Sequence, residues 1–329
     1  MNQMPLHAPI YIAGHNGLVG SAVLRRLKEL GYHNLITKFS SELDLTDYIQ
    51  TKHFFETYQP EYIFLCAARV GGILANASFP ATFIYDNLMI QSHVIHLAKE
   101  YGAKRLLFLG SSCIYPRNTP QPITEDAFLT GALERTNEPY AIAKIAGIEM
   151  CWAYNRQHQC AFLPVMPTNL YGPNDNYDAH SSHVLPAFIH KFHHAKKNEQ
   201  NELVLWGTGT AKREFLYSDD LANAVITLMN LPENFYRELI LSDNHRPLIN
   251  IGTGIDISIK DLALIVADIV GYKGKIFWDS SKPDGTPRKL LDISLINRFG
   301  WSPRIELKEG ISLSYQDYLS RTKVQKLKV

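Results

Sequence analysis

The stretch that decides the fold lies near the start of the chain, where residues 9–20 read PIYIAGHNGLVG. The apolar run over 9–13 predicts a buried strand, and apolar residues at three- to four-residue spacing predict a helix over 18–30. Gly14, Gly17 and Gly20 lie between and at the start of these elements, and they allow a tight turn and close backbone approach to a pyrophosphate. The free N–H groups and partial positive charge of the helix start favour the same ligand. The order strand, glycine turn and helix therefore predicts a dinucleotide-binding unit.

The same alternation continues through the first half of the chain. Apolar runs predict strands at 34–37, 62–66, 105–109 and 161–165, with helices between them at 47–58 (capped by Thr46), 80–101 and 140–157. This pattern predicts an α/β fold, a Rossmann-type doubly wound parallel sheet with helices on both faces.

The second half of the chain has a different pattern. Loops rich in Gly, Pro, Asn and Asp are expected at 167–182, 206–220 and 279–288, with helices at 183–197, 219–230 and 258–270. We expect a dinucleotide-binding Rossmann domain over 1–170, with a segment near 215–252 returning to it. Residues 171–329 are then mostly a smaller C-terminal substrate-binding lobe.

Composition excludes several classes of protein. The 329 residues are 46% hydrophobic and carry a formal net charge of +1, which gives no overall field toward nucleic acid or an acidic membrane. No apolar stretch approaches the roughly 20 residues of a membrane span, and the amino terminus does not resemble a signal peptide. The four cysteines form no CxxC pair, and no histidine or cysteine cluster has metal-ligand spacing. We expect a cytoplasmic protein with no metal, no nucleic-acid partner and no membrane association.

The segment after the second strand bears on the choice of nicotinamide cofactor. NAD enzymes place an acidic residue there to bind the ribose 2′-hydroxyl, but residues 37–41 read TKFSS and the first acid is Glu42. Lys38 and the two serines suit a 2′-phosphate, so the segment favours NADP(H). The alternative, that Lys38 is an ordinary surface lysine, stays open at this point.

Tyr140 and Lys144 are four residues apart on a predicted helix and so share one face. A lysine ammonium beside a phenol is expected to lower the tyrosine pKa from about 10 toward neutrality. Ser111 follows the strand at 105–109, at the carboxyl edge where such sheets bind ligands. In an extended segment Cys113 would point the same way as Ser111. By spacing alone a buried structural cysteine is the more common explanation of Cys113.

Six motifs, taken together, carry a resemblance to a known family: GHNGLVG (14–20), ARVGGILAN (68–76), GSSCIYP (110–116), PYAIAK (139–144), MPTNLYGPND (166–175) and KPDGTPRK (282–289). In this order they closely resemble the GDP-L-fucose synthase family of the extended short-chain dehydrogenase/reductase superfamily. The resemblance covers nearly the whole chain, and its GSSCIYP and KPDGTPRK blocks are far more specific than the glycine turn. It implies NADPH-dependent 3,5-epimerisation and 4-reduction of GDP-4-keto-6-deoxy-D-mannose to GDP-L-fucose.

The resemblance also implies roles for individual residues. Ser111 and Tyr140 stabilise the C4 oxygen, Lys144 holds the nicotinamide ribose, and Cys113 and His183 form the acid–base pair of the epimerisation. The implied cofactor-binding residues are Gly14, Gly17, Leu18, Val19, Gly20, Lys38, Ala67, Ala68, Gly110, Ser111, Tyr140, Lys144, Pro167, Asn169, Leu170 and His183. The implied substrate-binding residues are Asn169, Lys191, Trp206, Arg213, Asp284 and Lys289.

Two residues depart from the family pattern. Lys191 stands where many members have arginine, which keeps the charge but loses the planar fork. Asn16 stands where bacterial relatives often have arginine, which removes one positive group from the glycine turn.

Three alternative functions stay open. They are the same chemistry on a related GDP-4-keto sugar (a GDP-6-deoxy-heptose or a GDP-3,6-dideoxy-hexose), a non-redox nucleotide-sugar epimerase, and a nucleotide-sensing protein without catalysis. By fold analogy we expect a homodimer formed through the helices at 80–101 and 140–157.

Overall fold

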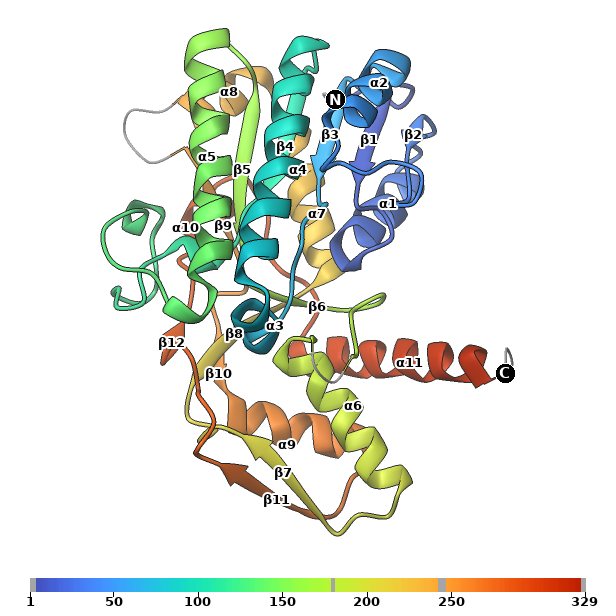
Figure 1. Cartoon of the computed structure of the whole chain (residues 1–329), viewed down its shortest axis with the longest axis vertical. Coiled ribbons are helices and arrows are strands. Elements are labelled where there is room, and N and C mark those ends of the chain that lie inside the picture. Colours follow the sequence, from blue (N-terminus) through green and yellow to red (C-terminus); the bar gives the residue numbers. More distant parts are fainter. Residues whose placement is uncertain (1–3, 179–180, 242–246, 327–329) are drawn as a thin grey trace.

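The computed structural model describes residues 4–178, 181–241 and 247–326, the last four of these by their backbone alone. Figure 1 shows a larger upper region, built on a sheet between helices, above a smaller region formed mainly by later parts of the chain. Across these ranges no helix combines the length and the apolar character needed to cross a bilayer.

The upper region is built on a six-stranded sheet in the order β2-β1-β3-β4-β5-β9, and every neighbouring pair is parallel. This confirms the predicted Rossmann-type sheet. Its strands are β1 (Ile10–Ala13), β2 (Leu35–Ile36), β3 (Tyr62–Leu65), β4 (Arg105–Leu109), β5 (Phe162–Pro167) and β9 (Ile249–Ile251).

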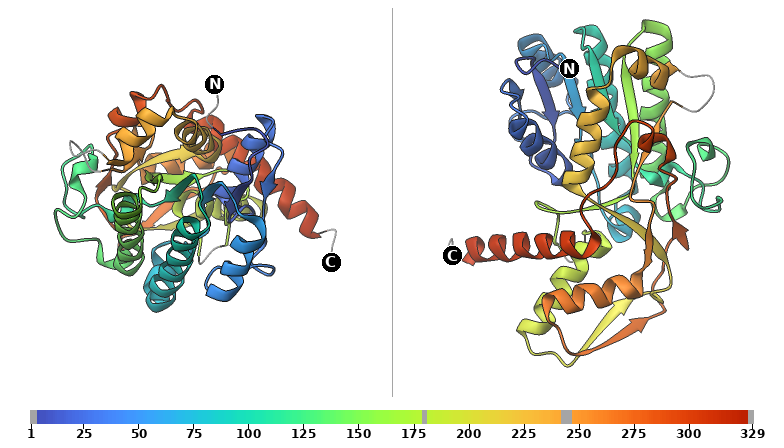
Figure 2. Two further views of the ribbon diagram at one scale, coloured as in Figure 1. Left: turned by 90° about the horizontal axis from the view of Figure 1, so that it is seen from above. Right: turned by 180° about the vertical axis from the view of Figure 1, so that it is seen from behind.

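Alternate side chains of β1 show why the sheet is covered on both faces. Ile10 and Ile12 pack into one apolar cluster with helices α1 (Leu18–Glu29) and α7 (Ser218–Met229). Tyr11 and Ala13 pack into a second cluster with α2 (Tyr48–Tyr58), α4 (Pro80–Glu100) and α5 (Glu138–His158). Successive strand residues point to opposite faces, so a strand that is apolar throughout needs helices on both. The views in Figure 2 show these two helical layers.

The smaller region is organised around strand β8 (Lys212–Tyr217). It pairs with β6 (Asn169–Tyr171), β10 (Asp256–Ser258) and β12 (Arg288–Lys289), while β7 (Glu202–Trp206) pairs with β11 (Lys275–Asp279). Helices α6 (Val184–Lys197), α9 (Ile259–Val270) and α11 (Leu307–Lys326) surround a third apolar cluster. The prediction of a loop over 206–220 is therefore wrong. β8 escaped prediction because it starts exposed and ends with residues 215–217 buried in succession, so it has no two-residue alternation.

Other short elements were also missed, and one cap was misassigned. The sequence analysis did not predict the strands of the smaller region. It also did not predict four helices: α3 (Ile73–Ser78), α8 (Glu233–Leu241), α10 (Ser294–Asn297) and α11. Asp47, not Thr46, caps α2: its Oδ1 accepts from the backbone N–H groups of Ile49 at 2.8 Å and Gln50 at 3.1 Å. Thr46 instead donates its hydroxyl to Asp44 at 2.7 Å.

Helix α11 projects sideways from the smaller region (Figures 1 and 2) and is tied to the segment that leads to α6. The Tyr177 hydroxyl donates to the Ser314 carbonyl at 2.9 Å, and Arg321 Nη1 donates to the Asp175 carbonyl at 2.9 Å. The two bonds hold residues 175–177 against one side of this helix.

A buried carboxylate joins the strands of the smaller region to the large sheet. Glu214 is fully buried on β8, and its oxygens accept backbone N–H groups from Thr253, Gly254 at 2.7 Å and Leu291 at 3.0 Å. Burial raises the pKa of Glu214, and the three backbone donors oppose that shift. Its backbone carbonyl also accepts from Asn169 Nδ2 at 2.8 Å. Four separate segments therefore meet at this one residue.

We expect Glu214→Ala to lower the free energy of unfolding by about 3 kcal/mol, because it leaves three buried N–H groups without acceptors. Urea denaturation with linear extrapolation measures the change. Glu214→Gln keeps one acceptor oxygen and should lose less. A Glu214→Ala protein as stable as the parent would contradict the role of this carboxylate.

Candidate active site

The turn after β1 has the geometry that a nucleotide phosphate needs. Gly14 has φ +78°, and a Cβ added at Gly20 would overlap the Gly14 carbonyl oxygen. Gly17 caps α1 without any side-chain hydrogen bond, so no side chain covers the N–H groups of the first turn. Leu18 and Val19 are the first two residues of that helix. The turn therefore presents backbone donors to the edge of the sheet.

We expect Gly20→Ala to lower the melting temperature by about 5 °C, because its new methyl group forces apart a packed turn. The matched control is Gly17→Ala, whose Cβ would lie 3.5 Å from the Gly14 carbonyl oxygen, an ordinary contact, and whose φ of −83° suits alanine. Thermal unfolding without ligand compares the two. Equal melting temperatures would show that the turn has more room than the structure indicates.

Most of the other expected cofactor residues lie at the same carboxyl edge of the sheet. Ala67 and Ala68 follow β3, Gly110 and Ser111 follow β4, and Pro167 ends β5. Asn169 and Leu170 begin the short strand β6 directly beyond β5. Ligands of open α/β sheets bind at this edge.

Lys38 is held in a way that the sequence did not indicate. Its ammonium lies 5.1 Å from the centroid of the Tyr58 ring, and a hydrogen bond with Tyr58 raises the pKa of Lys38. The structure also shows that His15 is buried within the glycine turn, with its ring centroid 4.7 Å from that of Phe39. A histidine inside a glycine motif has no periodic signal, so sequence analysis did not single it out.

Tyr140 lies in the first turn of α5, where it is hydrogen-bonded to Ser111. Burial raises the pKa of Tyr140, and nearby Cys113 raises it further. Lys144 Nζ donates to the Leu109 carbonyl at 2.8 Å and lies 5.9 Å from the Tyr140 ring centroid. The lowered tyrosine pKa expected from spacing is therefore wrong in this structure, because desolvation dominates and the lysine proton is directed elsewhere. Tyr140 keeps its proton at neutral pH and is a hydrogen-bond donor.

Lys144 is itself 3% exposed, and burial lowers its pKa to about 8. Its position between the end of β4 and Tyr140 explains this shift, because an ammonium there has lost most of its hydration.

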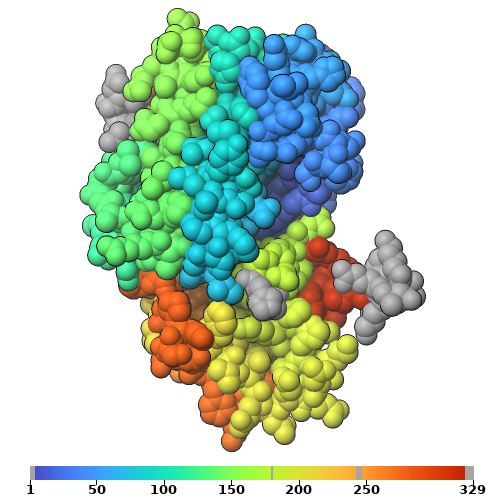
Figure 3. All heavy atoms as spheres, in the orientation of Figure 1, coloured from blue at the N-terminus to red at the C-terminus, as the bar shows by residue number. Residues whose placement is uncertain are grey.

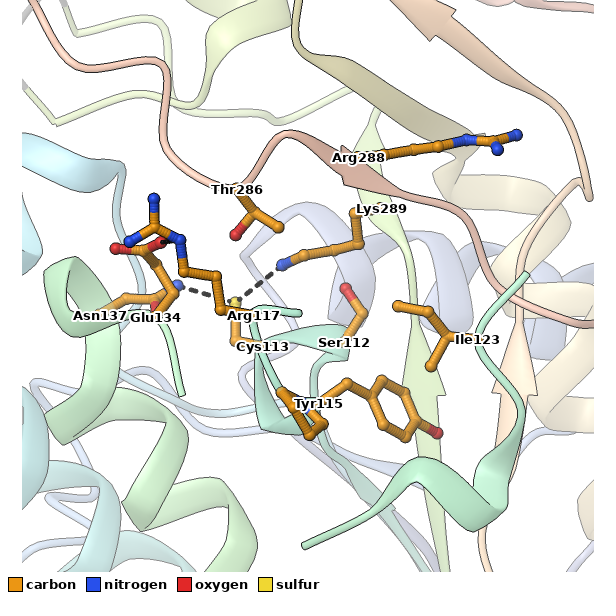
Figure 4. Close-up of a pocket in the computed structure, with 11 residues that line it drawn as sticks. Ser112, Cys113, Tyr115, Arg117, Ile123, Glu134, Asn137, Thr286, Arg288 and Lys289 are labelled. Carbon is orange, nitrogen blue, oxygen red and sulfur yellow. Dashed lines mark hydrogen bonds and ion pairs between the residues drawn. The ribbon is translucent and has the colours of Figure 1, made fainter. Parts of the chain in front are cut away.

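Cys113 lies in a 3₁₀ turn over Ser112–Ile114, so the extended geometry expected for this segment is wrong. The Ser111 hydroxyl accepts from the Cys113 backbone N–H at 3.3 Å, which keeps the two residues adjacent. The Cys113 sulfur accepts from Asn137 Nδ2 at 3.0 Å and from Lys289 Nζ at 3.6 Å. Figure 4 shows all three side chains converging at one pocket.

His183 immediately precedes α6 and does not cap it with its side chain. Its side chain is exposed yet has protein around it, and this partial desolvation lowers the pKa of His183. The positive charge of Lys289 lowers that pKa further. Nearby, the Gly72 N–H donates to the Ser181 carbonyl at 3.0 Å, which joins the two regions of the molecule.

The expected substrate residues form two groups. Trp206 is 52% exposed, and the ammonium groups of Lys191 and Lys282 lie 5.3 Å and 5.6 Å from its ring centroid. Arg213 Nη2 donates to the Asp284 carbonyl at 3.2 Å.

The Asp284 carboxylate already accepts from the Thr208 N–H and hydroxyl, each at 2.8 Å, so it braces a loop. Lys289, which the resemblance placed among the substrate-binding residues, contacts the Cys113 sulfur, and its part in substrate binding stays a prediction. Lys282 and Asn137 were not predicted as site residues, although both lie within or beside motifs already quoted. In the part of the chain that the structure describes, no three potential metal ligands lie together.

The fold and this edge of the sheet define a class of enzyme that binds a dinucleotide and acts beside it. The sequence profile of the NAD dependent epimerase/dehydratase family matches residues 10–241, more than half of the chain.

Comparison with individual proteins shows which smaller family within this one the chain belongs to. The chain is 52% identical to GDP-L-fucose synthase 1 of Arabidopsis thaliana, over 95% of this chain and 93% of that one. It is 48% identical to GDP-L-fucose synthase of Escherichia coli, over 94% and 96%. A solved GDP-mannoheptose C4 reductase from Campylobacter jejuni with NADP bound is 40% identical, has a TM-score of 0.86 and covers 96% of this chain and 99% of its own. The chain therefore belongs to the GDP-L-fucose synthase family, within the NAD dependent epimerase/dehydratase family.

Proposed function

We propose that this chain converts GDP-4-keto-6-deoxy-D-mannose to GDP-L-fucose by 3,5-epimerisation followed by NADPH-dependent reduction at C4. The observation that carries the proposal is a pair of neighbouring groups at one edge of the sheet. Ser111 and Tyr140 form one, suited to a carbonyl oxygen, and Cys113, Lys289 and His183 form the other, suited to moving protons on carbon. Relatives at about half identity carry the name of this activity.

The epimerisation needs a base and an acid on opposite faces of the sugar ring. C3 and C5 both lie next to the C4 ketone, so removal of either proton sends the electron pair to the C4 oxygen. Ser111 and Tyr140 donate hydrogen bonds to that oxygen and stabilise its developing charge. Cys113 and His183 exchange the carbon-bound protons, one group removing a proton and the other returning one to the opposite face.

The reduction uses the same oxygen-binding pair. When bound, NADPH supplies the hydride that C4 accepts. Tyr140, which burial keeps protonated, gives its proton to the C4 oxygen, and Ser111 holds that oxygen in line. The Lys144 ammonium lies 5.9 Å from the Tyr140 ring centroid. There it would hold the nicotinamide ribose and would stabilise the phenolate that remains once the Tyr140 proton has left.

The glycine turn and the carboxyl edge fit an NADP(H) molecule. The backbone N–H groups in the first turn of α1, which begins at Leu18, suit its pyrophosphate, and the segment with Lys38 suits the 2′-phosphate. The Campylobacter relative was solved with NADP.

Residues of the smaller region would hold the other end of the substrate. The cations of Lys191, Lys282 and Arg213 suit the GDP diphosphate, and the exposed Trp206 ring suits a flat base. Residues 171–329 would then mostly serve as the substrate-binding lobe.

A second candidate is the same chemistry on a related GDP-4-keto sugar. The observation in its favour is that the Campylobacter relative, over nearly the same length, is named for a heptose substrate. The two candidates share every residue role given above and differ only in the groups around the sugar ring.

Turnover of GDP-4-keto-6-deoxy-mannose with NADPH in deuterated water tests the proposal. We expect NADPH to be consumed and the product to carry deuterium at both C3 and C5. NADPH loss without deuterium would leave a simple 4-reductase. Failure of turnover in folded, NADP-binding protein would reject this sugar, and the same assay with the heptose would test the second candidate.

Two substitutions separate the half-reactions in that assay. Tyr140→Phe should slow NADPH oxidation by about 100-fold or more, because the carbonyl oxygen loses its proton donor. Cys113→Ala should block deuterium entry and leave reduction of the unepimerised ketone. Normal product stereochemistry at the normal rate from Cys113→Ala would show that this cysteine has no part in the epimerisation.

We further propose that the protein is a cytoplasmic homodimer formed through α4 and α5. All four cysteines are free, which fits a reducing compartment. Both helices expose large apolar side chains, among them Tyr85 at 60% and Ile142 at 43%. The α4 surface, drawn cyan, runs beside the green α5 surface on the face shown in Figure 3.

Tyr85→Glu should therefore convert a dimer into a monomer, because it places a charge within the apolar contact. Light scattering after size-exclusion chromatography measures the mass. Ile49→Glu on α2, where the side chain is 78% exposed, is the matched control and should stay dimeric. A monomeric parent protein would reject the proposal.

A further inference from the structure

The sulfur of Cys113 receives two donors from parts of the chain far apart in sequence. Asn137, 24 residues further along, donates from Nδ2 at 3.0 Å, and Lys289, 176 residues further along, donates from Nζ at 3.6 Å. Both bonds are drawn in Figure 4, where the two donors approach the sulfur from different sides. A thiol that only filled space would need neither contact.

Asn137 contacts the sulfur and does not cap the helix that follows it. It is the residue before α5, a place where asparagine commonly caps a helix with its side chain, but here it makes no such bond. Its amide is turned to the sulfur instead, and its Oδ1 atom is buried with no partner among the described residues. The direction of this side chain is thus set by the pocket and not by the helix.

Lys289 connects Cys113 to the second candidate proton-transfer group. It lies on β12, paired with Arg213 of β8, and its ammonium is the charge that acts on His183. The Lys289 ammonium thus acts on a cysteine that belongs to the upper region and on a histidine that belongs to the smaller region.

We propose that Asn137 and Lys289 are positioning residues for the epimerisation, holding the Cys113 sulfur ready to exchange a proton with the sugar ring. The inference rests on the proposed function and deepens it. The two donors fix the direction of the sulfur. On the thiol they leave the S–H bond to face the substrate, and on the thiolate they leave its third lone pair to do so. The Lys289 ammonium holds the sulfur in place, and its positive charge lowers the pKa of His183, so that the protonated imidazole gives up a proton readily. The proposed exchange moves protons only between the sulfur, the imidazole and the sugar.

Hydride transfer should depend on these two residues far less. Tyr140, Ser111 and Lys144 make none of their described bonds to Asn137 or Lys289. Loss of either positioning residue should therefore slow proton exchange at C3 and C5 more than reduction at C4.

The test compares Lys289→Met, Lys289→Arg and Asn137→Ala with the parent protein. Deuterium uptake at C3 and C5 is followed with NADP⁺ present, where no reduction occurs, and NADPH oxidation is followed separately. We expect uptake to fall about 10-fold or more in Lys289→Met and Asn137→Ala, with a smaller fall in reduction. Lys289→Arg, which keeps the charge, should recover much of the uptake.

Arg288→Met is the matched control. Arg288 is the neighbouring residue on β12, but its guanidinium points away from the cysteine and pairs with Asp256. The ratio of deuterium uptake to NADPH oxidation should equal that of the parent protein.

The pH dependence of uptake gives a readout that a merely structural role would not move. Lys289 is one of two causes that lower the pKa of His183, so its removal should raise that pKa toward its ordinary value. The limb of the uptake profile that belongs to His183 should then shift to higher pH in Lys289→Met. Asn137→Ala removes no charge and should leave this limb in place.

The outcomes separate the two proposals. A parent protein that places no deuterium at C3 or C5 rejects the proposed function. A parent protein that does so, with variants of unchanged ratio and unshifted pH profile, overturns the positioning roles alone. If Lys289→Met does not fold, as judged by its thermal transition, Asn137→Ala and Lys289→Arg still decide the question, because normal uptake in Asn137→Ala contradicts the inference.

Discussion

The buried carboxylate of Glu214 is the interaction on which the arrangement of the site depends. It gathers N–H groups from the turn after β9 and from the segment after β12, while its own backbone carbonyl holds Asn169. Arg213, the residue before it, donates to the Asp284 carbonyl, and Lys289 lies two residues before Leu291. One carboxylate thus fixes the register of the strands that carry both cations. Backbone donors replace the water that this buried carboxyl group has lost, and they oppose the rise in its pKa that burial causes.

The candidate site is shared between the two regions of the molecule. The larger region contributes Ser111, Cys113 and Tyr140, all beside the carboxyl ends of its strands, and the smaller region contributes His183 and Lys289. Only together do the two sets contain both Cys113 and His183, the acid–base pair proposed above. Contacts between the regions, such as the bond from Gly72 to Ser181, hold the two sets together.

The parts of this structure that local patterns determine were predictable. The glycine turn, the parallel strands and the long helices α4 and α5 follow from periodicity, because each element's pattern is contained within its own residues. The strands of the smaller region escaped prediction, since β6, β10 and β12 have two or three residues each and are stabilised by pairing with β8.

In the candidate site, family resemblance predicted Cys113, His183 and Lys289 as site residues but could not place Lys289 beside the sulfur, because that contact spans 176 residues. The tyrosine pKa was predicted in the wrong direction, because helical spacing gives the distance between two side chains but not the solvent they lose. The pattern Tyr140-x-x-x-Lys144 is thus a guide to proximity and a poor guide to protonation.

Helix α11 has a consequence for how the protein is handled. Arg321 of this helix donates to the Asp175 carbonyl, and the Ser314 carbonyl of the helix accepts from the Tyr177 hydroxyl. The helix is thereby tied to residues 175–177, which precede in the sequence one of the groups that would move protons on the sugar. A truncation that removes α11 would take away both bonds, so the effect of altering this helix would extend to the segment that leads to the candidate site.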